Sequence, residues 1–537
     1  MENHFTIPSK LSRNSERTGR THVLRSAKSP RARIAVWVLP LIVGLLALLS
    51  PVLPLMAQSS TSTFSFPDSG GISLTTADTS SALHVGYAQI SETAAIAAGF
   101  AIFGLQQNNA LVSEATVPAA NLIREGRIYA EIGDGVNTGI AIANPNNETV
   151  LIAFYFTDSA GAQFGANAIT IPPNGQIARF LTEPPFNGGS VFLGTLTFFT
   201  LSSASDITVA AIALRGFTNE RGEFLMTTLP VTPVGQRGLF SGDTIPHFAS
   251  GGGWATQIIL VNPTGTELRG TIAFTDQTGQ LAVIDTENGP GAFFSYRVAA
   301  RSSWRLRTSN TGSLYVGSVR LRTSTDGSDI PIGFLIFRYQ SAAGITVTEA
   351  GVPPARSAVA SRLFVETSGQ FDAGEPGSLE TGIAISNAAS LAPVRVNLDL
   401  TTLSGPSAGL HGTLDISGGG QIAKFLNQIP GLESLPFPFQ GVLRISAPSA
   451  ITTIGLRARH NERGDFLVTT VPVVNENDDY FTFVLRYSKF VFPHFVGGGG
   501  YTTQFVLFSG WQPGSASGTL QFLTSAGDLF PLTLEAR

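Results

Sequence analysis

The residues that could perform chemistry in this chain are few and widely separated. Cysteine is absent, which removes thiolate nucleophiles and thiolate metal ligands. The sequence has no His-Glu-x-x-His, Gly-x-Ser-x-Gly or Walker motif, and no Gly-x-Gly-x-x-Gly between a strand and a helix. A zinc site would have to assemble isolated histidines from distant segments: His84, His247, His411, His460 and His494. We therefore predict that the protein is not an enzyme, with no catalytic residues, no metal site and no cofactor.

Two histidines nevertheless occupy matching positions. His247 and His494 each stand in a Pro-His-Phe sequence, just before a run of glycines. An imidazole in that setting could bind a ligand or a carboxylate of a partner. The alternative, which we favour, is that each histidine fills a hydrogen-bonded position beside the start of a strand.

An aromatic residue follows each glycine run, Trp254 in one place and Tyr501 in the other. Aromatic faces stack on sugar rings or peptides, so both are candidate binding residues. Glycine also permits a bulge or a close approach of two strands, in which case the ring packs on the neighbouring linker. We favour packing.

A charged turn also occurs twice, with Arg221 beside Glu220 and Arg463 beside Glu462 in the sequence Asn-Glu-Arg-Gly. The two arginines could form a repeated recognition patch. Exposed hairpin turns are commonly charged only because they are solvated, and we favour that interpretation.

The charge balance argues against nucleic acid as a partner. Lys and Arg number 33 against 37 Asp and Glu, and eight of the Lys and Arg lie before residue 34. The remainder is acidic and has no basic stripe to neutralise phosphates. A calcium cage needs closely packed oxygen ligands, and only the region around Asp372, Glu375 and Glu380 leaves that possibility open.

The first 57 residues have the pattern of a signal peptide or membrane anchor. A basic stretch precedes the apolar run 34–57, which Pro51 and Pro54 interrupt shortly before Ala57. We favour cleavage after Ala57; an uncleaved segment would be the only contact with a membrane. Either way the protein is predicted to be exported to the extracellular space, cell surface or periplasm, and its lack of cysteine suits a bacterial origin.

The rest of the chain repeats itself, which indicates modules of about 120 residues. The second half of one repeat, 85–118, returns at 316–353. Four shorter sequences recur in the same order: Thr-Gly-Ile-Ala-Ile at 138 and 381, Gly-Gln-Ile-Ala at 175 and 420, Asn-Glu-Arg-Gly at 219 and 461, and Pro-His-Phe at 246 and 493.

Within a module, short runs rich in β-branched and aromatic residues alternate with glycine and proline turns, as in antiparallel β-sandwiches. We predict an all-β fold of tandem antiparallel β-sandwich (Ig-like) modules. The expected segments are: 1–57 signal or anchor, 58–120 half module of later strands, 129–233 module 1, 240–355 module 2, 362–475 module 3, and 488–537 half module of earlier strands.

These modules resemble the tandem Ig-like or fibronectin-like repeats of bacterial secreted and cell-surface proteins, over residues 60–537. Such repeats share no catalytic residues, and the Cys…Trp…Cys hallmark of true immunoglobulin domains is missing here. The resemblance implies an exported structural or adhesive protein whose partner is an unidentified protein or glycan. The alternative is a set of carbohydrate-binding accessory modules that use Trp254, Tyr501, Trp304 or Trp511 as platforms.

The half modules at the two ends need cover, because an open half-sheet leaves unpaired edges and an apolar face in water. The ends could complete one another, each half could pack on its neighbour, or each later half could join the next earlier half. The array could also be incomplete. We favour an incomplete array, because the last segment stops before any counterpart of the Gly-Gln-Ile-Ala-Arg-Phe-Leu sequence.

Overall fold

The computed structural model describes residues 60–536 except 78–79, 93–96, 203, 205–206, 236–242, 326–328, 389, 477–488 and 511–513. The predicted signal or anchor segment, 1–57, lies outside the described residues, and so does the predicted start of module 2 at residue 240. Within the described ranges, no helix is long and apolar enough to cross a bilayer.

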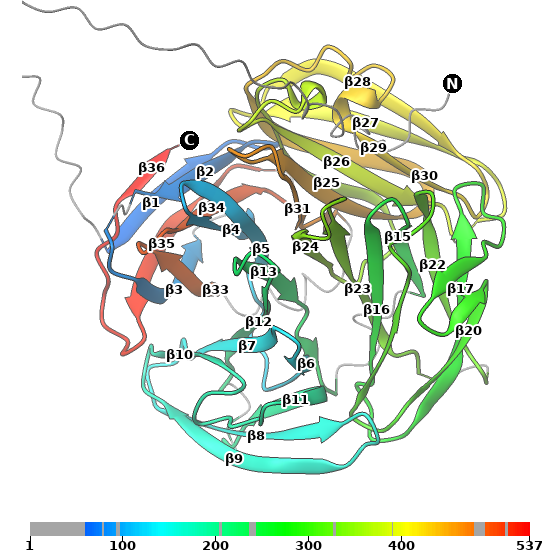
Figure 1. Cartoon of the computed structure of the whole chain (residues 1–537). Helices are drawn as coiled ribbons and strands as arrows, with labels where there is room; N and C mark the ends of the chain where they lie inside the picture. Colours follow the sequence, from blue (N-terminus) through cyan, green and yellow to red (C-terminus); the bar gives the residue numbers. More distant parts are fainter. Residues whose placement is uncertain are drawn as a thin grey trace, which may run out of the picture. The chain divides into compact units, whose positions relative to one another are not determined.

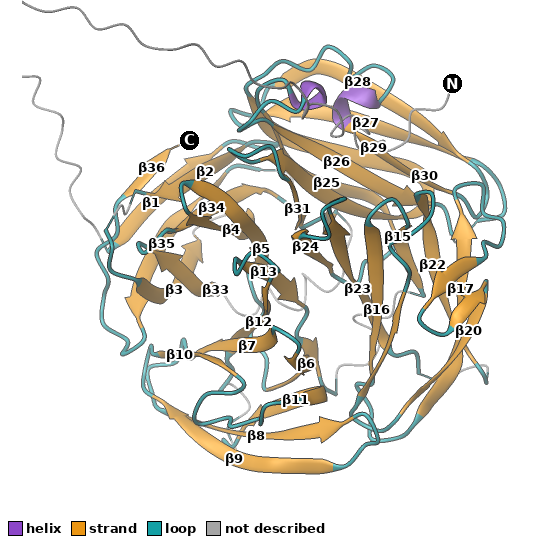
Figure 2. Cartoon of the chain, viewed as in Figure 1, coloured by secondary structure: helices purple, strands orange, loops and turns teal. Residues whose placement is uncertain are grey.

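The prediction of an all-β fold is confirmed, since antiparallel strands make up nearly all regular structure of the described residues (Figure 2). Their alternating patterns explain why. In β27 (Val394–Thr402), Val396 and Leu398 are buried while Arg395 and Asn397 are exposed, so one face meets a core and the other meets water. Two short 3-10 turns occur in the part of the chain that the structure describes, η1 (Phe371–Ala373) and η2 (Leu426–Gln428).

We group the strands into four sets, called modules A to D (Figure 1). Module A contains β6 (Glu125–Gly133), β7 (Val136–Ala143), β8 (Val150–Asp158), β9 (Gln163–Ile171), β10 (Gln176–Phe180), β11 (Phe192–Thr200), β12 (Ala210–Thr218), β13 (Phe224–Leu229) and β14 (Thr232–Pro233). Module B contains β15 (Thr244–Ser250), β16 (Trp254–Val261), β17 (Leu268–Asp276), β18 (Ile284–Thr286), β19 (Gly289–Gly291), β20 (Phe293–Val298), β21 (Ser303–Arg307), β22 (Tyr315–Thr323), β23 (Ile332–Gln340) and β24 (Thr346–Val352).

Module C contains β25 (Ala358–Thr367), β26 (Leu379–Ser386), β27, β28 (Ser407–Ile416), β29 (Gln421–Phe425), β30 (Phe439–His460), β31 (Phe466–Val471) and β32 (Val474–Asn475). Module D joins the two ends of the chain. It contains β33 (Lys489–Gly497), β34 (Tyr501–Ser509), β35 (Ala516–Thr524) and β36 (Leu534–Ala536), together with β1 (Thr61–Phe66), β2 (Gly71–Thr76), β3 (His84–Glu92), β4 (Ala97–Gln107) and β5 (Ala110–Pro118).

Module D has the strand order of module B, although its strands come from opposite ends of the chain. The sheets of module B run β15-β22-β17-β20 and β21-β16-β23-β24. Those of module D run β33-β3-β35-β1 and β36-β2-β34-β4-β5. The segment after residue 488 thus supplies the opening strands of module D, equivalent to β15, β16 and β17 of module B. The segment before residue 119 supplies the later strands, equivalent to β20 to β24.

The two end segments therefore complete one module. Phe64 of β1 pairs with Gly518, and Phe103 of β4 pairs with Thr503. Phe64 and Phe103 also share a core with Phe505. The prediction of an incomplete array is wrong. The last segment of the chain has no counterpart of the Gly-Gln-Ile-Ala-Arg-Phe-Leu strand, but β2, from the other end of the sequence, takes that place beside β34. β2 covers the edge of β34 that would otherwise stay unpaired.

Candidate functional site at the junctions between modules

The junctions A–B and C–D are built alike, each from a sheet of one module that completes the core of the other. Strands β16 and β23 of module B contribute to the core of module A. Strands β34 and β4 of module D contribute to that of module C. The residues stand at matching places in the two repeats: Ile259, Val261, Phe334 and Ile336 at the first junction, and Val506, Phe508, Phe100 and Ile102 at the second.

The last long strands of the four modules, β5, β13, β24 and β31, lie together (Figure 1). Side-chain hydroxyls join their backbones. The Met226 amide donates to Ser113 Oγ at 2.7 Å, and the Val468 amide donates to Thr348 Oγ1 at 3.1 Å. Hydroxyls thus satisfy backbone groups that the strand pairs leave open.

A buried arginine crosses each of the two like junctions. Arg215 of module A pairs with Glu349 of module B. Arg457 of module C pairs with Glu114 of module D, and also with Glu366 of module C at 3.3 Å. Burial alone would lower the pKa of Arg457, but Glu114 and Glu366 raise it above its ordinary value. These pairs were not predicted from the sequence, where their signal is a charged residue that recurs in the middle of an apolar strand.

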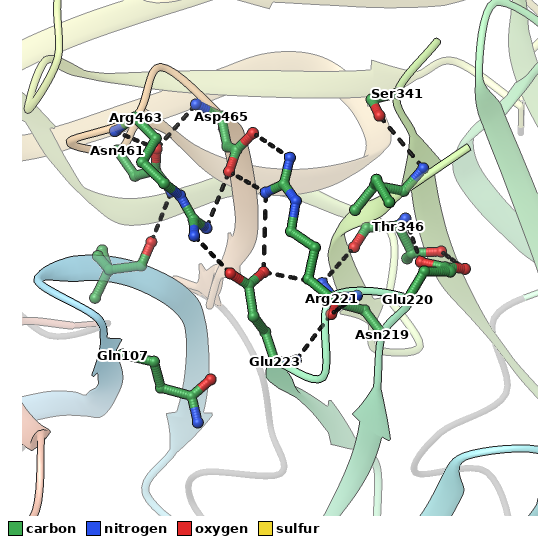
Figure 3. A network of polar contacts seen from close by, with 12 residues as sticks. Gln107, Asn219, Glu220, Arg221, Glu223, Ser341, Thr346, Asn461, Arg463 and Asp465 are labelled. Atoms are coloured by element: carbon green, nitrogen blue, oxygen red, sulfur yellow. Dashed lines mark hydrogen bonds and ion pairs between the residues drawn. The ribbon is translucent and has the colours of Figure 1, made fainter. Parts of the chain in front are cut away.

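The repeated charged turns meet each other across the molecule (Figure 3). Arg221 of module A donates to Asp465 of module C at 2.7 Å, and Arg463 of module C donates to Glu223 of module A at 2.5 Å. The side chain of Asn219 accepts the amides of Arg221 and Glu223, which fixes the turn. Arg221 and Arg463 therefore form a reciprocal brace between modules A and C, and the favoured interpretation, that these turns are charged only because they are solvated, is wrong.

The glutamates of the same turns reach neighbouring modules. Glu220 accepts the amide of Thr346 in module B at 2.7 Å, and Glu462 accepts the amide of Leu111 in module D at 2.8 Å. Both turns are thus used for contacts between modules, and a binding role for Arg221 and Arg463 stays the less favoured alternative.

The two matching histidines mark the other kind of junction, B–C and D–A. Gln176 Nε2 of module A contacts His494 Nδ1 at 3.1 Å, and Gln421 Nε2 of module C contacts His247 Nδ1 at 3.1 Å. Gln176 Nε2 also donates to the carbonyl of Pro493 at 2.6 Å, which identifies that atom as the amide nitrogen. His494 Nδ1 is then an acceptor, and the neutral ring carries its proton on Nε2.

Acid should weaken these two junctions. Burial lowers the pKa of His247 and of His494 to about 4, from 6.5. Between those values the unfolded chain binds protons that the folded chain does not, so stability is fully present above pH 6.5 and falls as the pH drops toward 4. The slope reaches about 1.4 kcal/mol per pH unit for each histidine.

Denaturant unfolding between pH 7 and pH 4.5 measures this effect. The double variant His247→Gln/His494→Gln keeps an acceptor for each glutamine partner and should show a shallower decline than the parent. An equal decline in both proteins would show that the two histidines do not titrate in this window.

The aromatic residues that the carbohydrate-binding alternative would use as platforms differ in their exposure. Trp254 is 7% exposed and packs on Tyr339 and Phe466, with ring centroids 4.9 and 6.2 Å apart. Tyr501 is only half-buried. Trp304 lies beside Tyr296, and Trp511 falls outside the described residues.

The acidic residues considered for calcium do not form a cage. Asp372 accepts the side-chain amide of Asn427, and Glu375 accepts the amide of Gln370. Glu380 is buried, and burial, with a smaller effect from Asp372, raises its pKa to about 8. Within the described ranges, no group of three or more His, Cys, Asp or Glu side chains is placed to hold a metal ion.

A cavity of about 320 Å³ lies at the D–A junction. Strands β10, β7, β12 and β13 of module A line one side, and β33, β34 and β4 of module D line the other. Both His494 and Tyr501 line this cavity, so the structure brings together two of the residues singled out from the sequence. We therefore take it as the candidate ligand site.

Comparisons with known proteins add no assignment. No protein-family model matches the sequence, and no curated protein shows significant similarity to it. Among solved structures, an infectious bursal disease virus VP2 subviral particle matches at 9% identity and TM-score 0.11, over 75% of this chain and 81% of that one.

Two further matches are virus structures at the same low level. Sulfolobus Turreted Icosahedral Virus matches at 10% identity and TM-score 0.11, covering 78% of this chain and 89% of that one. A triple jelly roll protein of an archaeal virus matches at 10% identity and TM-score 0.12, covering 82% and 91%. Similarity this weak transfers neither fold nor function.

Proposed function

We propose that the chain is an exported, non-catalytic structural or adhesive protein of a bacterial cell surface or periplasm, built from Ig-like β-sandwich modules of about 120 residues. The observation that carries the proposal is that the charged side chains form ion pairs between modules. Arg215, Arg457, Arg221 and Arg463 all pair with carboxylates of other modules. Groups that an enzyme would hold ready for substrate serve here to lock modules together.

Such contacts favour a rigid arrangement of the modules. Arg215 and Arg457 have only 1% of their side chains exposed, and each junction of their kind also has a continuous apolar core. A rigid body presents its outer loops in a fixed arrangement, which lowers the entropy lost when a partner binds.

The outer surface of module B offers apolar side chains to such a partner. Leu281 and Phe293 are each 55% exposed, and they face Thr275 and Ala273, two residues apart on β17. Exposed apolar side chains that gather on one face mark interaction surfaces more often than isolated ones do.

Export and binding can be tested together. A bacterial host expressing the full chain should place it in the envelope, whereas a variant lacking residues 1–57 should remain in the cytoplasm. The purified segment 58–537 should then be screened against peptidoglycan, polysaccharides and envelope proteins. Cytoplasmic location of the full chain, or turnover of a substrate that a single substitution abolishes, would overturn the proposal; retention on a polysaccharide would favour the carbohydrate-binding alternative.

A further inference from the structure

We propose that the cavity at the D–A junction binds a small planar aromatic compound that carries one hydrogen-bond acceptor. The cavity volume of about 320 Å³ falls at the small end of the range for ligand sites. Its walls are mainly apolar, and the rings of Phe103, Phe180, Phe224 and Tyr501 lie around it. Rings of this kind pack edge-to-face or offset-stacked on an aromatic guest.

The matching junction B–C indicates what fits such a space. Trp254 stands there at the position of Tyr501, and its indole packs on Phe466, the counterpart of Phe224. The loop between Glu366 and Gly382 is also longer than its counterpart in module A. The same region of the fold thus accommodates an indole ring from the chain itself.

The longer loop supplies a second ring at junction B–C. Phe371 of η1 packs on Phe425 and on His460, with ring centroids 4.9 Å apart in both cases. In module A the tight turn at Asp134 replaces this loop, and in module D the smaller Tyr501 replaces the tryptophan. Both differences leave room at junction D–A for an aromatic ring from outside.

The polar groups of the cavity select one acceptor on the ligand. His494 lines the cavity while its Nδ1 accepts from Gln176, so the ring has a donor, Nε2–H, left for a guest. Tyr501 adds a hydroxyl, whose pKa is raised by burial, so it keeps its proton at neutral pH. The two groups together suit a phenolic or carbonyl oxygen.

The cavity is open to solvent at its rim. Leu83 is 56% exposed and Val85 is 37% exposed, and both line it. Arg179 and Glu183 are exposed at the same rim. A neutral aromatic molecule can therefore enter along an apolar edge without breaking a buried ion pair.

Binding can be measured with para-fluorophenol, using fluorine NMR on the segment 58–537. The parent should broaden and shift the signal at one saturable site, and fluorobenzene, which lacks the hydroxyl, should bind several-fold more weakly. Tyr501→Trp should fill the space as Trp254 does and weaken binding by at least about tenfold. Tyr501→Phe keeps the space open and should bind within a few-fold of the parent.

A second filling variant guards against misfolding of the first. Ala178→Leu enters the same cavity from β10 of module A and should also weaken binding, with thermal melting confirming that both variants fold. Absence of saturable binding to the parent, or unchanged binding in two folded filling variants, would overturn the proposal. Weaker binding in both filling variants with retention in Tyr501→Phe would support it.

Discussion

Replacing Arg457 with methionine should lower the free energy of unfolding by about 3–5 kcal/mol, because it leaves Glu114 and Glu366 buried beside each other without their shared cation. The matching change Arg215→Met should lower the free energy of unfolding by less. Without Arg215, Glu349 still has an ion pair with Arg338 at 2.7 Å, whereas without Arg457 the nearest remaining arginine, Arg459, is 3.8 Å from Glu114. Urea unfolding of both variants at pH 7 measures the difference.

The double variant Arg457→Met/Glu114→Gln provides the control. Neutralising Glu114 removes one of the two stranded charges and should recover part of the loss, which a double-mutant cycle separates from the effect of each single change. If Arg457→Met cost less than about 1 kcal/mol, or no more than Arg215→Met, the buried pair would not stabilise the C–D junction as described.

Deleting residues 58–118 should expose the core of module D. The deletion removes β1 to β5, and with them both neighbours of β34 and both neighbours of β35. Amide hydrogen exchange in β34 and β35 should then accelerate by roughly three orders of magnitude or more, because those amides lose their strand partners. Module C should be weakened as well, since Phe100 of β4 belongs to its core.

A circular permutant distinguishes the effect of unpaired strands from the effect of a shorter chain. Joining residue 537 to residue 58 with a flexible linker, and opening the chain between Ala355 and Arg356, keeps every strand of module D in the protein. This permutant should retain the slow exchange of β34. Slow exchange in the deletion variant itself would show that the two end segments do not depend on each other.

The strand content could be predicted from the sequence because it depends on local patterns. Alternating burial in β27 and the turn glycines follow from residue types a few positions apart. The preference for structural roles at His247 and Trp254 rested on the same local reasoning. The structure shows both of them buried between modules.

Contacts between distant segments could not be predicted in this way. Nothing near Arg457 in the sequence indicates that its partner is Glu114, and nothing near β34 indicates that β2 and β4 cover it. Periodicity shows which strands are equivalent, but a repeat looks the same whether its ends meet or stay apart. The cavity could not be predicted for a related reason. It exists because Tyr501 is smaller than Trp254 at the matching position, and because the turn at Asp134 is shorter than the matching loop of module C.

The reciprocal brace of Arg221 with Asp465 and Arg463 with Glu223 has the form of an isologous dimer interface, in which each partner offers the same residues to the other. In a homodimer of two-module chains every substitution would appear twice. A single chain frees the two copies to diverge. In this chain one junction has Trp254, and the other has Tyr501 beside an open cavity.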